Sequence, residues 1–475
     1  MTVNYYVKCP MCNTITRMRS PAGYIYSTPV HIHCGKCNTL LTGEFISDNK
    51  KIKAYYVPSN CEQVREEDYE YYGEASGEIL CNKIEPLPGK KTDILPPKQS
   101  PVFDFLFSKD MEDNERFINY ACYICELLEK WDCEKIKYDL FLNNNFDLIR
   151  DKYSSQAISC GYELNTKFDV LRFIYYSYFF DCGGIFNQKE LKKQLISINY
   201  HFRHLDSSAL KKYICYLNEE NRLDIVQRKL FEVMFSFIKA SKYLTPAINA
   251  ILYKNTSEID REKVGITTCT FGDIKQFYQD AFEILAECCD IVVGLDNIDN
   301  RNDFNSFTNK FDMTKFRQQT KGNRIIHLSK EEFFSKNFSM SSKSKELRNA
   351  IGHSDYSYNG VSQELTYTVQ STGEIKKEYL LDIAVECIEL MRSAYILTFY
   401  IYELFRNIAR ENAENVILHP MFYSQSKGQD RCPCGSNKKY NACCKNNLIK
   451  INKRSNQYPQ KANMEMNKIL NGLRK

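Results

Sequence analysis

Six consecutive residues, Arg348-Asn349-Ala350-Ile351-Gly352-His353, carry side chains whose types and spacing could do chemistry. An imidazole can accept and return a proton near neutral pH. A guanidinium can bind a phosphate group and stabilise the charge that this group gains in a transition state. An Arg and a His held together are what cleavage of RNA without a metal ion requires, and Asn349 could position either the His or the phosphate.

The spacing of these residues limits how they can meet on a helix. Asn349 and His353 are four residues apart and therefore share a face. Arg348 and His353 are five apart, which is about 140° around a regular helix. They converge only through the reach of the Arg side chain or if the helix loosens. Gly352 is a poor interior helix residue and would permit this loosening.

Arg348-x4-His353, with Asn directly after the Arg and long amphipathic helices on both sides, resembles the HEPN superfamily, which has the signature R-x(4–6)-H. The resemblance extends over residues 268–412 and implies a helical-bundle endoribonuclease. In that family the ribose 2′-hydroxyl attacks the adjacent phosphodiester, and two motifs face each other across a dimer cleft. Tyr356 is a supporting candidate, because family members often carry a Tyr shortly after the His. The resemblance also implies a role in bacterial anti-phage defence, as an abortive-infection or toxin-like protein.

A second such motif is absent from the sequence, because residues 406–410 begin alike but contain no His. One motif per chain makes half a site and predicts a symmetric homodimer. A structural role is the alternative: residues 352–355 are typical of a helix end, where the helix dipole favours a cationic His. A HEPN bundle that binds RNA without cleaving it is a further alternative. A metal-dependent hydrolase fits less well, since the chain has no His-x-x-x-His, paired Asp array or Gly-rich phosphate loop.

Two groups of cysteines have the spacing of metal sites. The first consists of Cys9-x-x-Cys12 and Cys34-x-x-Cys37. A tight turn between paired Cys residues points backbone amides at the thiolates, and two such turns make a tetrahedral site that suits Zn²⁺. We therefore expect a structural zinc ion here, within a zinc ribbon.

Short strands are predicted around these cysteines by β-branched and aromatic residues, at 24–34, 40–46 and 53–57. His31 and His33 are expected to be exposed strand residues, because the four Cys already close the site. Zinc ribbons bind nucleic acid or protein, but many only fold their own domain, which has little core of its own.

The second group of cysteines lies near the end of the chain and consists of Cys432, Cys434, Cys443 and Cys444. The segment 432–444, CPCGSNKKYNACC, resembles the SEC-C motif, a small zinc hook. Asn437 stands where the family usually has Gly, and Asn tolerates the left-handed conformation. The resemblance implies a second structural Zn²⁺ and docking to a protein partner or a ribosome. Neither site is expected to be catalytic, because four thiolates leave no open position on the metal.

The composition is ordinary for a globular protein of two to four domains: 475 residues, 43% hydrophobic and 26% charged. No N-terminal segment resembles a signal peptide, and the most apolar run, 393–405, is too short to span a bilayer. We expect a cytoplasmic protein with no membrane partner. In that compartment, 20 cysteines argue against a disulfide framework.

The net charge of +5 is unevenly distributed. Residues 445–475 contain eight Lys or Arg and one Glu, a net +7, which leaves −2 for the rest of the chain. Such a tail is either a solvated, disordered segment or an electrostatic contact with RNA or a ribosome.

Hydrophobic periodicity predicts a mainly α protein of helical bundles, with a small β module at the N-terminus and a short zinc hook at the C-terminus. The expected order is a zinc-ribbon module at 1–80, a Pro- and Lys-rich linker at 81–100, a helical middle domain at 101–266, a HEPN-like bundle with a β-hairpin insertion at 267–415, the SEC-C motif at 426–446 and a basic tail at 447–475.

These observations predict a metal-independent endoribonuclease acting on tRNA, rRNA or mRNA. The alternative is a non-catalytic adaptor that docks to RNA or a ribosome through its two zinc modules.

Overall fold

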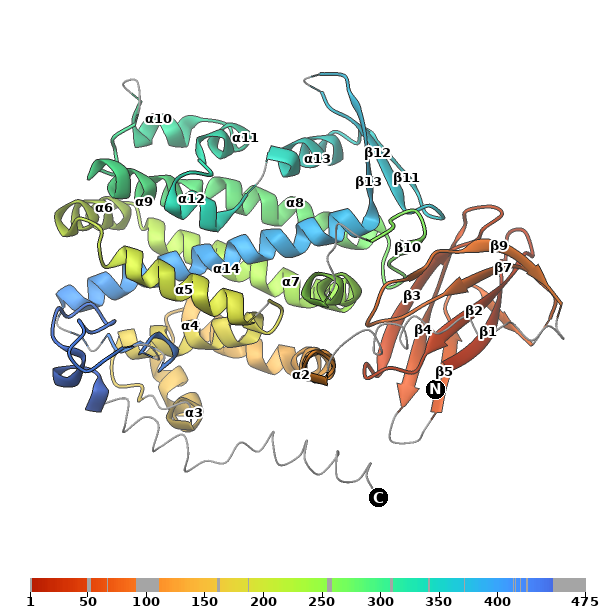
Figure 1. Ribbon diagram of the computed structural model, residues 1–475, viewed down its shortest axis with the longest axis horizontal. Helices are drawn as coiled ribbons and strands as arrows, with labels where there is room; N and C mark the ends of the chain where they lie inside the picture. The colour runs from red at the N-terminus through yellow and green to blue at the C-terminus, as the bar shows by residue number, and fades with distance from the viewer. Residues whose placement is uncertain are drawn as a thin grey trace.

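The structure of the chain is a computed structural model. It describes residues 2–48, 53–65, 67–90, 111–159, 163–186, 188–253, 259–307, 311–340, 342–370, 372–412, 414, 416–418, 420–423 and 426–446. A β-rich N-terminal module lies against one end of a helical body, and the C-terminal SEC-C module, residues 426–446, lies at the opposite end (Figure 1). The predicted basic tail at 447–475 falls outside the described residues.

The N-terminal module is built from two sheets. The larger sheet contains, in spatial order, β6 (Glu62–Val64), β1 (Thr2–Lys8), β2 (Ile15–Pro21), β7 (Tyr69–Glu74) and β9 (Glu85–Gly89). The smaller sheet contains β3 (Ser27–His33), β4 (Leu40–Asp48) and β5 (Lys53–Pro58). Alternate side chains point inward from both sheets and form a core of their own, in which the rings of Tyr5 and Tyr56 stack at 4.5 Å.

This module is longer than the sequence predicts. The predicted boundary at residue 80 precedes β8 (Cys81–Asn82) and β9, so the first residues of the predicted linker are strands. Pro86 and Pro88 favour a linker, but β9 is an edge strand, where a missing backbone N–H is tolerated. The remainder of the predicted linker, from residue 91 onward, is not among the described residues.

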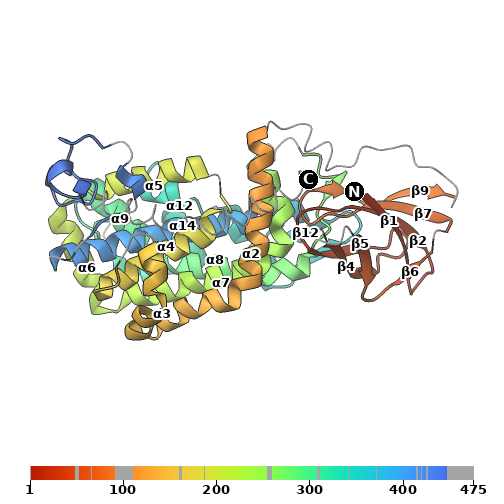
Figure 2. The same ribbon diagram turned by 90° about the horizontal axis from the view of Figure 1, so that it is seen from below.

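The helical body forms around two helices of 32 residues each, α7 (Arg222–Tyr253) and α14 (Leu380–Glu411), which run along its length (Figures 1 and 2). The other helices in the described part of the chain are α2 (Met111–Leu142), α3 (Phe146–Ser159), α4 (Lys167–Gly183), α5 (Gln188–Phe202), α6 (Ser207–Glu219), α8 (Phe271–Glu287), α9 (Cys289–Arg301), α10 (Met313–Gln318), α11 (Lys321–Arg324), α12 (Phe333–Phe338) and α13 (Ser342–Gly352). The prediction of a mainly α chain is confirmed. Among the helices that the structure describes, none is long and apolar enough to cross a membrane.

The division into helical domains at 101–266 and 267–415 is not seen. One continuous hydrophobic core extends over both predicted ranges. The reason is that α7, from the first range, packs against both α8 and α14, from the second. Apolar periodicity along the sequence reveals these helices but does not show which of them share a core.

A three-stranded antiparallel sheet stands between α13 and the N-terminal module (Figure 1). Its strands are β11 (Tyr356–Asn359), β12 (Glu364–Thr368) and β13 (Ile375–Tyr379). The predicted hairpin corresponds to β12 and β13, whereas β11 was not predicted. A short pairing between β8 and β10 (Val264–Gly265) joins the N-terminal module to the body close to this sheet.

Glu78 is a buried carboxylate in the loop that follows β7. Its Oε1 accepts hydrogen bonds from the amides of Tyr24 and Ile25, the latter at 2.8 Å. Its backbone carbonyl accepts a bond from Asn249 of α7 at 2.6 Å. Burial outweighs the two amide bonds to the carboxylate and raises the pKa of Glu78 from 4.5 to about 7.

Replacing Glu78 by Gln should therefore flatten the pH dependence of stability. Between pH 4.5 and about 7 the folded chain holds a proton on Glu78 that the unfolded chain has lost. The free energy of unfolding of the native chain thus falls as the pH rises through this window. In Glu78→Gln that slope should be shallower, as measured by urea unfolding at a series of pH values. An unchanged slope would contradict the assigned environment.

Candidate functional site

The helix α13 packs on α8 and carries the predicted catalytic residues Arg348 and Asn349. Its buried face consists of Leu347, Ala350 and Ile351, whose spacing of three and four residues matches one side of a helix. This packing leaves Arg348 and Asn349 half-buried, with His353 exposed just after the helix end.

Arg348 is held by α8. One guanidinium nitrogen forms an ion pair with Glu283, and Nη1 donates to Oδ1 of Asn349 at 3.0 Å. Lys321 at the start of α11 lies 3.1 Å from the same carboxylate. About a third of the Arg348 side chain is exposed (34%), so part of its fork of donors still faces solvent.

His353 lies where α13 unwinds. Its amide donates to the carbonyl of Asn349 at 3.0 Å, and Ser354 takes a left-handed conformation at φ 59° that turns the chain away. No side-chain hydrogen bond to the imidazole is found among the described residues. Gly352 has open space where a Cβ would stand, so the local geometry does not require a glycine for room. The helix ends at the predicted loosening point.

Tyr356 opens β11 and is also held by α8. Its hydroxyl accepts a hydrogen bond from Nζ of Lys275 at 3.3 Å, and its ring packs edge-on against Phe271 at 5.2 Å. Lys275 and Glu283 are two turns apart and lie on the same side of α8.

We call the surface formed by Arg348, Asn349, His353 and Tyr356 the motif strip. Side-chain contacts join Arg348 and Tyr356 to α8 and Asn349 to Arg348. His353 is exposed just after the end of α13, and no hydrogen bond joins its imidazole to Arg348. Glu283 and Lys275 were not predicted from the sequence. Their positions eight residues apart on the polar side of a strongly amphipathic helix could have indicated them.

The N-terminal cysteines form a cluster. The four Sγ atoms of Cys9, Cys12, Cys34 and Cys37 lie within 4.8 Å of one another. Across the cluster, Cys9 and Cys37 are 3.6 Å apart and Cys12 and Cys34 are 3.5 Å apart. Such a cluster can bind a metal ion, and its all-sulfur donor set is consistent with zinc.

Two equivalent turns build this cluster. Each has the sequence Cys-x-x-Cys-Asn-Thr, with the Asn in a left-handed conformation (φ 56° at Asn13 and 59° at Asn38). In the second turn the amides of Cys37 and Lys36 donate to the Cys34 sulfur, as the spacing predicts. Burial nevertheless raises the pKa of Cys34 to about 12.

The C-terminal cysteines form a second cluster at the far end of the body. Cys432, Cys434, Cys443 and Cys444 also place their Sγ atoms within 4.8 Å of one another. The turn between the pairs has two left-handed residues, Gly435 at φ 84° and Asn437 at φ 57°. Asn437 thus takes the conformation that the sequence analysis requires of it.

The SEC-C module is fastened to α14 by two arginines. Arg406 and Arg410 both donate to the carbonyl of Cys434, at 3.2 and 2.9 Å. Arg406 is fully buried (0% exposed) and forms an ion pair with Glu403, whose carboxylate also accepts from Asn199 at 3.1 Å. The segment 406–410, which resembles the start of a second Arg-His motif, therefore has a structural role.

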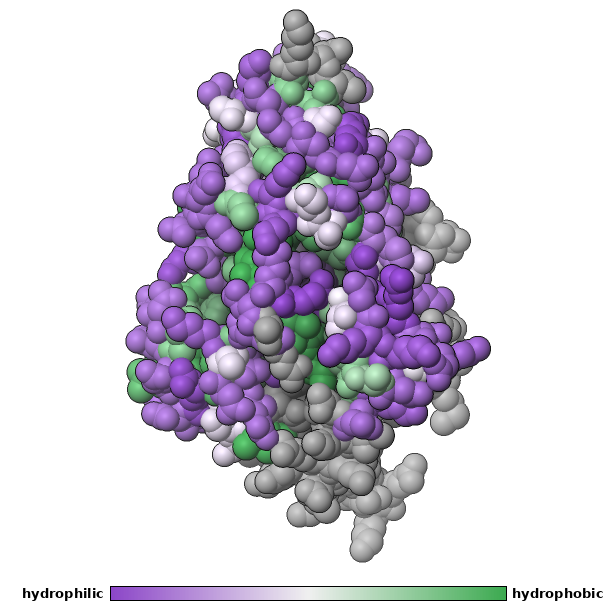
Figure 3. Space-filling model, turned by 90° about the vertical axis from the view of Figure 1, so that its left-hand side faces the viewer, coloured by the Kyte–Doolittle hydropathy of each residue, from purple (hydrophilic) through white to green (hydrophobic). Residues whose placement is uncertain are grey.

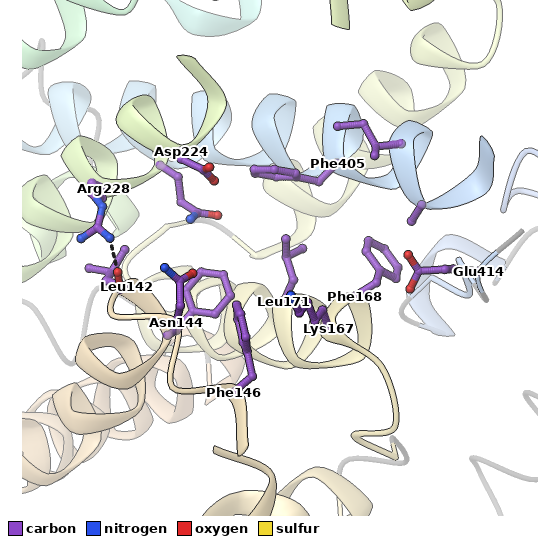
Figure 4. Close-up of a pocket in the computed structure, with 14 residues that line it drawn as sticks. Leu142, Asn144, Phe146, Lys167, Phe168, Leu171, Asp224, Arg228, Phe405 and Glu414 are labelled. Carbon is purple, nitrogen blue, oxygen red and sulfur yellow. Dashed lines mark hydrogen bonds between the residues drawn. The ribbon is translucent and has the colours of Figure 1, made fainter. Parts of the chain in front are cut away.

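An open groove of about 250 Å³ lies between the α2–α3 connection, α4, α7 and α14 (Figure 4). Its lining is mixed: four phenylalanines, Phe141, Phe146, Phe168 and Phe405, lie beside polar and charged side chains that include Lys167, Asp224 and Glu414. Two of its polar side chains bond within the chain: Gln227 accepts from Tyr175 at 2.9 Å, and Arg228 donates to the carbonyl of Leu142. The groove is remote from the motif strip, because α3 and α4 lie on the opposite side of α14 from α13 (Figure 1).

The end of the molecule in Figure 3 is mostly hydrophilic, with apolar residues in its central hollow.

Comparison with known proteins identifies one segment of the chain. Residues 430–446 match the SEC-C motif, which includes all four cysteines of the second cluster. The SEC-C resemblance predicted from the sequence is confirmed for this segment, and the match does not extend to the helical body. No curated protein and no solved structure matches the chain.

The buried pair under the SEC-C module gives a stability prediction. Arg406→Ala leaves the Glu403 carboxylate buried without its cation and should lower the free energy of unfolding by about 3–5 kcal/mol. It should also make residues 426–446 more sensitive to proteolysis. The control is Arg392→Ala on the same helix, where the side chain is 40% exposed and pairs with Glu389. That change should cost about 0–1 kcal/mol. Equal losses in urea unfolding would contradict the assigned role of Arg406.

Proposed function

We propose that the chain is a HEPN-type endoribonuclease that cleaves RNA at the motif strip. The observation that supports this most directly is the exposed imidazole of His353, five residues after a guanidinium that Glu283 orients from α8. A structural His at a helix end would gain from a partner, whereas a proton-transfer group must remain accessible to the substrate.

The reaction follows from the chemistry of these groups. The imidazole of His353 takes the proton of a ribose 2′-hydroxyl, and the 2′-oxygen attacks the adjacent phosphorus. The bond from phosphorus to the 5′-oxygen breaks, and this oxygen leaves with a proton. The products are a 2′,3′-cyclic phosphate and a 5′-hydroxyl. Arg348 stabilises the charge on the pentacovalent phosphorane, and no step calls for a divalent metal.

A homodimer completes this site. One strip offers one imidazole, whereas the reaction needs a base at the 2′-oxygen and an acid at the 5′-oxygen. His353 of the partner subunit would supply the second group. Arg348 keeps donors for the phosphate beyond those bound to Glu283 and Asn349. Lys275 and Lys321, both beside the strip, add positive charge along the path of the RNA backbone.

The test is RNA cleavage by the full chain and its variants, with sequencing of RNA 5′-hydroxyl ends. His353→Ala should lower the rate by about 10²–10⁴-fold, and Arg348→Ala by about 10²–10³-fold. Two matched controls should cleave like the native chain. His204→Ala removes an exposed His that bonds the carbonyl of Tyr200, and Arg392→Ala removes a partly exposed, ion-paired Arg.

Cleavage should persist when EDTA is present during the reaction. The metal content of the protein is measured afterwards, so that loss of structural metal is not mistaken for loss of a catalytic ion. Cleavage that survives His353→Ala would remove the strip from the chemistry. If the protein acts in anti-phage defence, expression of the native chain should arrest bacterial growth, and His353→Ala should relieve the arrest.

A non-catalytic adaptor is the second candidate, and the mounting of the SEC-C module favours it. The module is fixed to α14, and Lys438 and Lys439 on its turn are exposed for contact with RNA or a ribosome. An adaptor would bind RNA or ribosomes equally well with and without His353 and would cleave nothing. Binding without cleavage by the native chain would therefore decide for this candidate.

We propose Zn²⁺ for both four-cysteine clusters, because thiolate ligands in a closed site select this ion over harder cations. The purified chain should contain two zinc ions, one for each cluster. Cys34→Ser/Cys37→Ser should lose only the first ion and Cys443→Ser/Cys444→Ser only the second, measured by elemental analysis. Full zinc content in either variant, or another metal in the native chain, would refute the assignment.

A further inference from the structure

The last strand before the second metal turn, β3, contacts the N-terminal end of α8. The amide of His31 donates to the carbonyl of Thr267 at 2.7 Å, and its Nδ1 lies 3.0 Å from Oδ2 of Asp273. His31 is 16% exposed in its side chain, so it is largely covered by the body. This differs from the sequence analysis, which expects His31 and His33 to be solvent-exposed strand residues.

The ring of His33 lies between the metal turn and the sheet next to α13. On one side its Nδ1 bonds the carbonyl of Asn38, the left-handed residue of the second turn, at 3.0 Å. On the other side the ring meets Tyr358 of β11 edge-on at 6.2 Å and covers Gly360. A Cβ on Gly360 would come within 2.2 Å of the His33 ring, so only a glycine permits this approach.

A short series of contacts continues from these histidines to the motif strip. The ring of Phe271 lies 5.9 Å from Tyr358 and 5.2 Å from Tyr356, the last residue of the strip. Asp273, which holds His31, is two residues before Lys275, which holds Tyr356. The first turn of α8 and the start of β11 therefore touch the metal-binding module on one side and the strip on the other.

We infer that metal binding by the N-terminal four-cysteine cluster holds the motif strip in place, with His31 and His33 as the positioning residues that transmit the constraint. The inference rests on the proposed function only for its effect on catalysis. A four-cysteine cluster folds around its ion, so loss of the metal loosens the turn at 34–39, to which His33 is bonded. Other contacts of this interface involve no residue of the cluster: Lys83 bonds the carbonyl of Arg261 at 2.5 Å, and β8 pairs with β10.

Hydrogen exchange of the full chain, followed by mass spectrometry, tests this inference without reference to RNA. Cys34→Ser/Cys37→Ser should exchange on the order of tenfold faster at 353–363 and in the first turn of α8. Cys443→Ser/Cys444→Ser is the matched control, because the second cluster lies at the opposite end of the molecule (Figure 1). It should leave those segments unchanged. Confirmed loss of the first ion with unchanged exchange there would overturn the inference.

A second variant keeps the test valid if the cysteine variant fails to fold. His31→Ala, with its zinc content intact, should speed exchange in the first turn of α8 and at 353–363 but not at the C-terminal end of α14. His31→Asn should restore protection, since Asn Nδ2 can replace His Nδ1 as the donor to Asp273. Equal exchange in His31→Ala and the native chain would overturn the inference. Changed exchange in a chain that cleaves no RNA would instead refute the proposed function alone.

Discussion

The position of the N-terminal module against the helical body depends on the contacts of one carboxylate, that of Asp273. It accepts bonds from the amide and hydroxyl of Thr270, at 2.7 and 2.8 Å, and so begins α8. It also lies 3.0 Å from His31 and so fixes the N-terminal module to that helix. Burial acts to raise the pKa of Asp273, but the bonds from His31 and Thr270 outweigh it and lower the pKa to about 2. A group that stays ionised at physiological pH can keep both contacts, which explains how a helix in the core also serves as a mount for a separate β module.

The two four-cysteine clusters are joined to the body by different kinds of interaction, and this difference suggests different roles. The C-terminal cluster rests on a fully buried arginine, which is costly to desolvate and strongly destabilising to disturb. The N-terminal module meets the body through histidine contacts, aromatic edges and a short strand pairing, each of which is weaker. A rigid mount suits a module that presents a surface to a partner. A weaker and distributed interface suits a module whose state can influence its neighbour, and its neighbour here is the motif strip.

The sequence predicts the local features well and the long-range ones poorly. Both four-cysteine clusters follow from the spacing of their residues, and the left-handed Asn437 follows from the chemistry of a tight turn. The helices follow from apolar periodicity. The contact between His31 and Asp273 joins residues 242 positions apart, and no pattern in one sequence indicates it. The shared core of α7, α8 and α14 was missed for the same reason, because periodicity marks a buried face without naming what covers it.

The end of α13 determines how the five-residue spacing of Arg348 and His353 appears in the structure. On a regular helix, Arg348 and His353 point about 140° apart, and the structure does not bend the helix to bring them together. Instead the helix stops at Gly352, and His353 leaves it in the turn that Ser354 completes. Arg348 turns toward Glu283, and no hydrogen bond joins it to His353. A cavity of about 280 Å³ lies beside this strip, and Glu283, the partner of Arg348, is part of its lining. If the strip cleaves RNA as we propose, this cavity and the neighbouring sheet of β11–β13, with the N-terminal module behind it, are the surfaces available to set a preference for particular RNA (Figure 1).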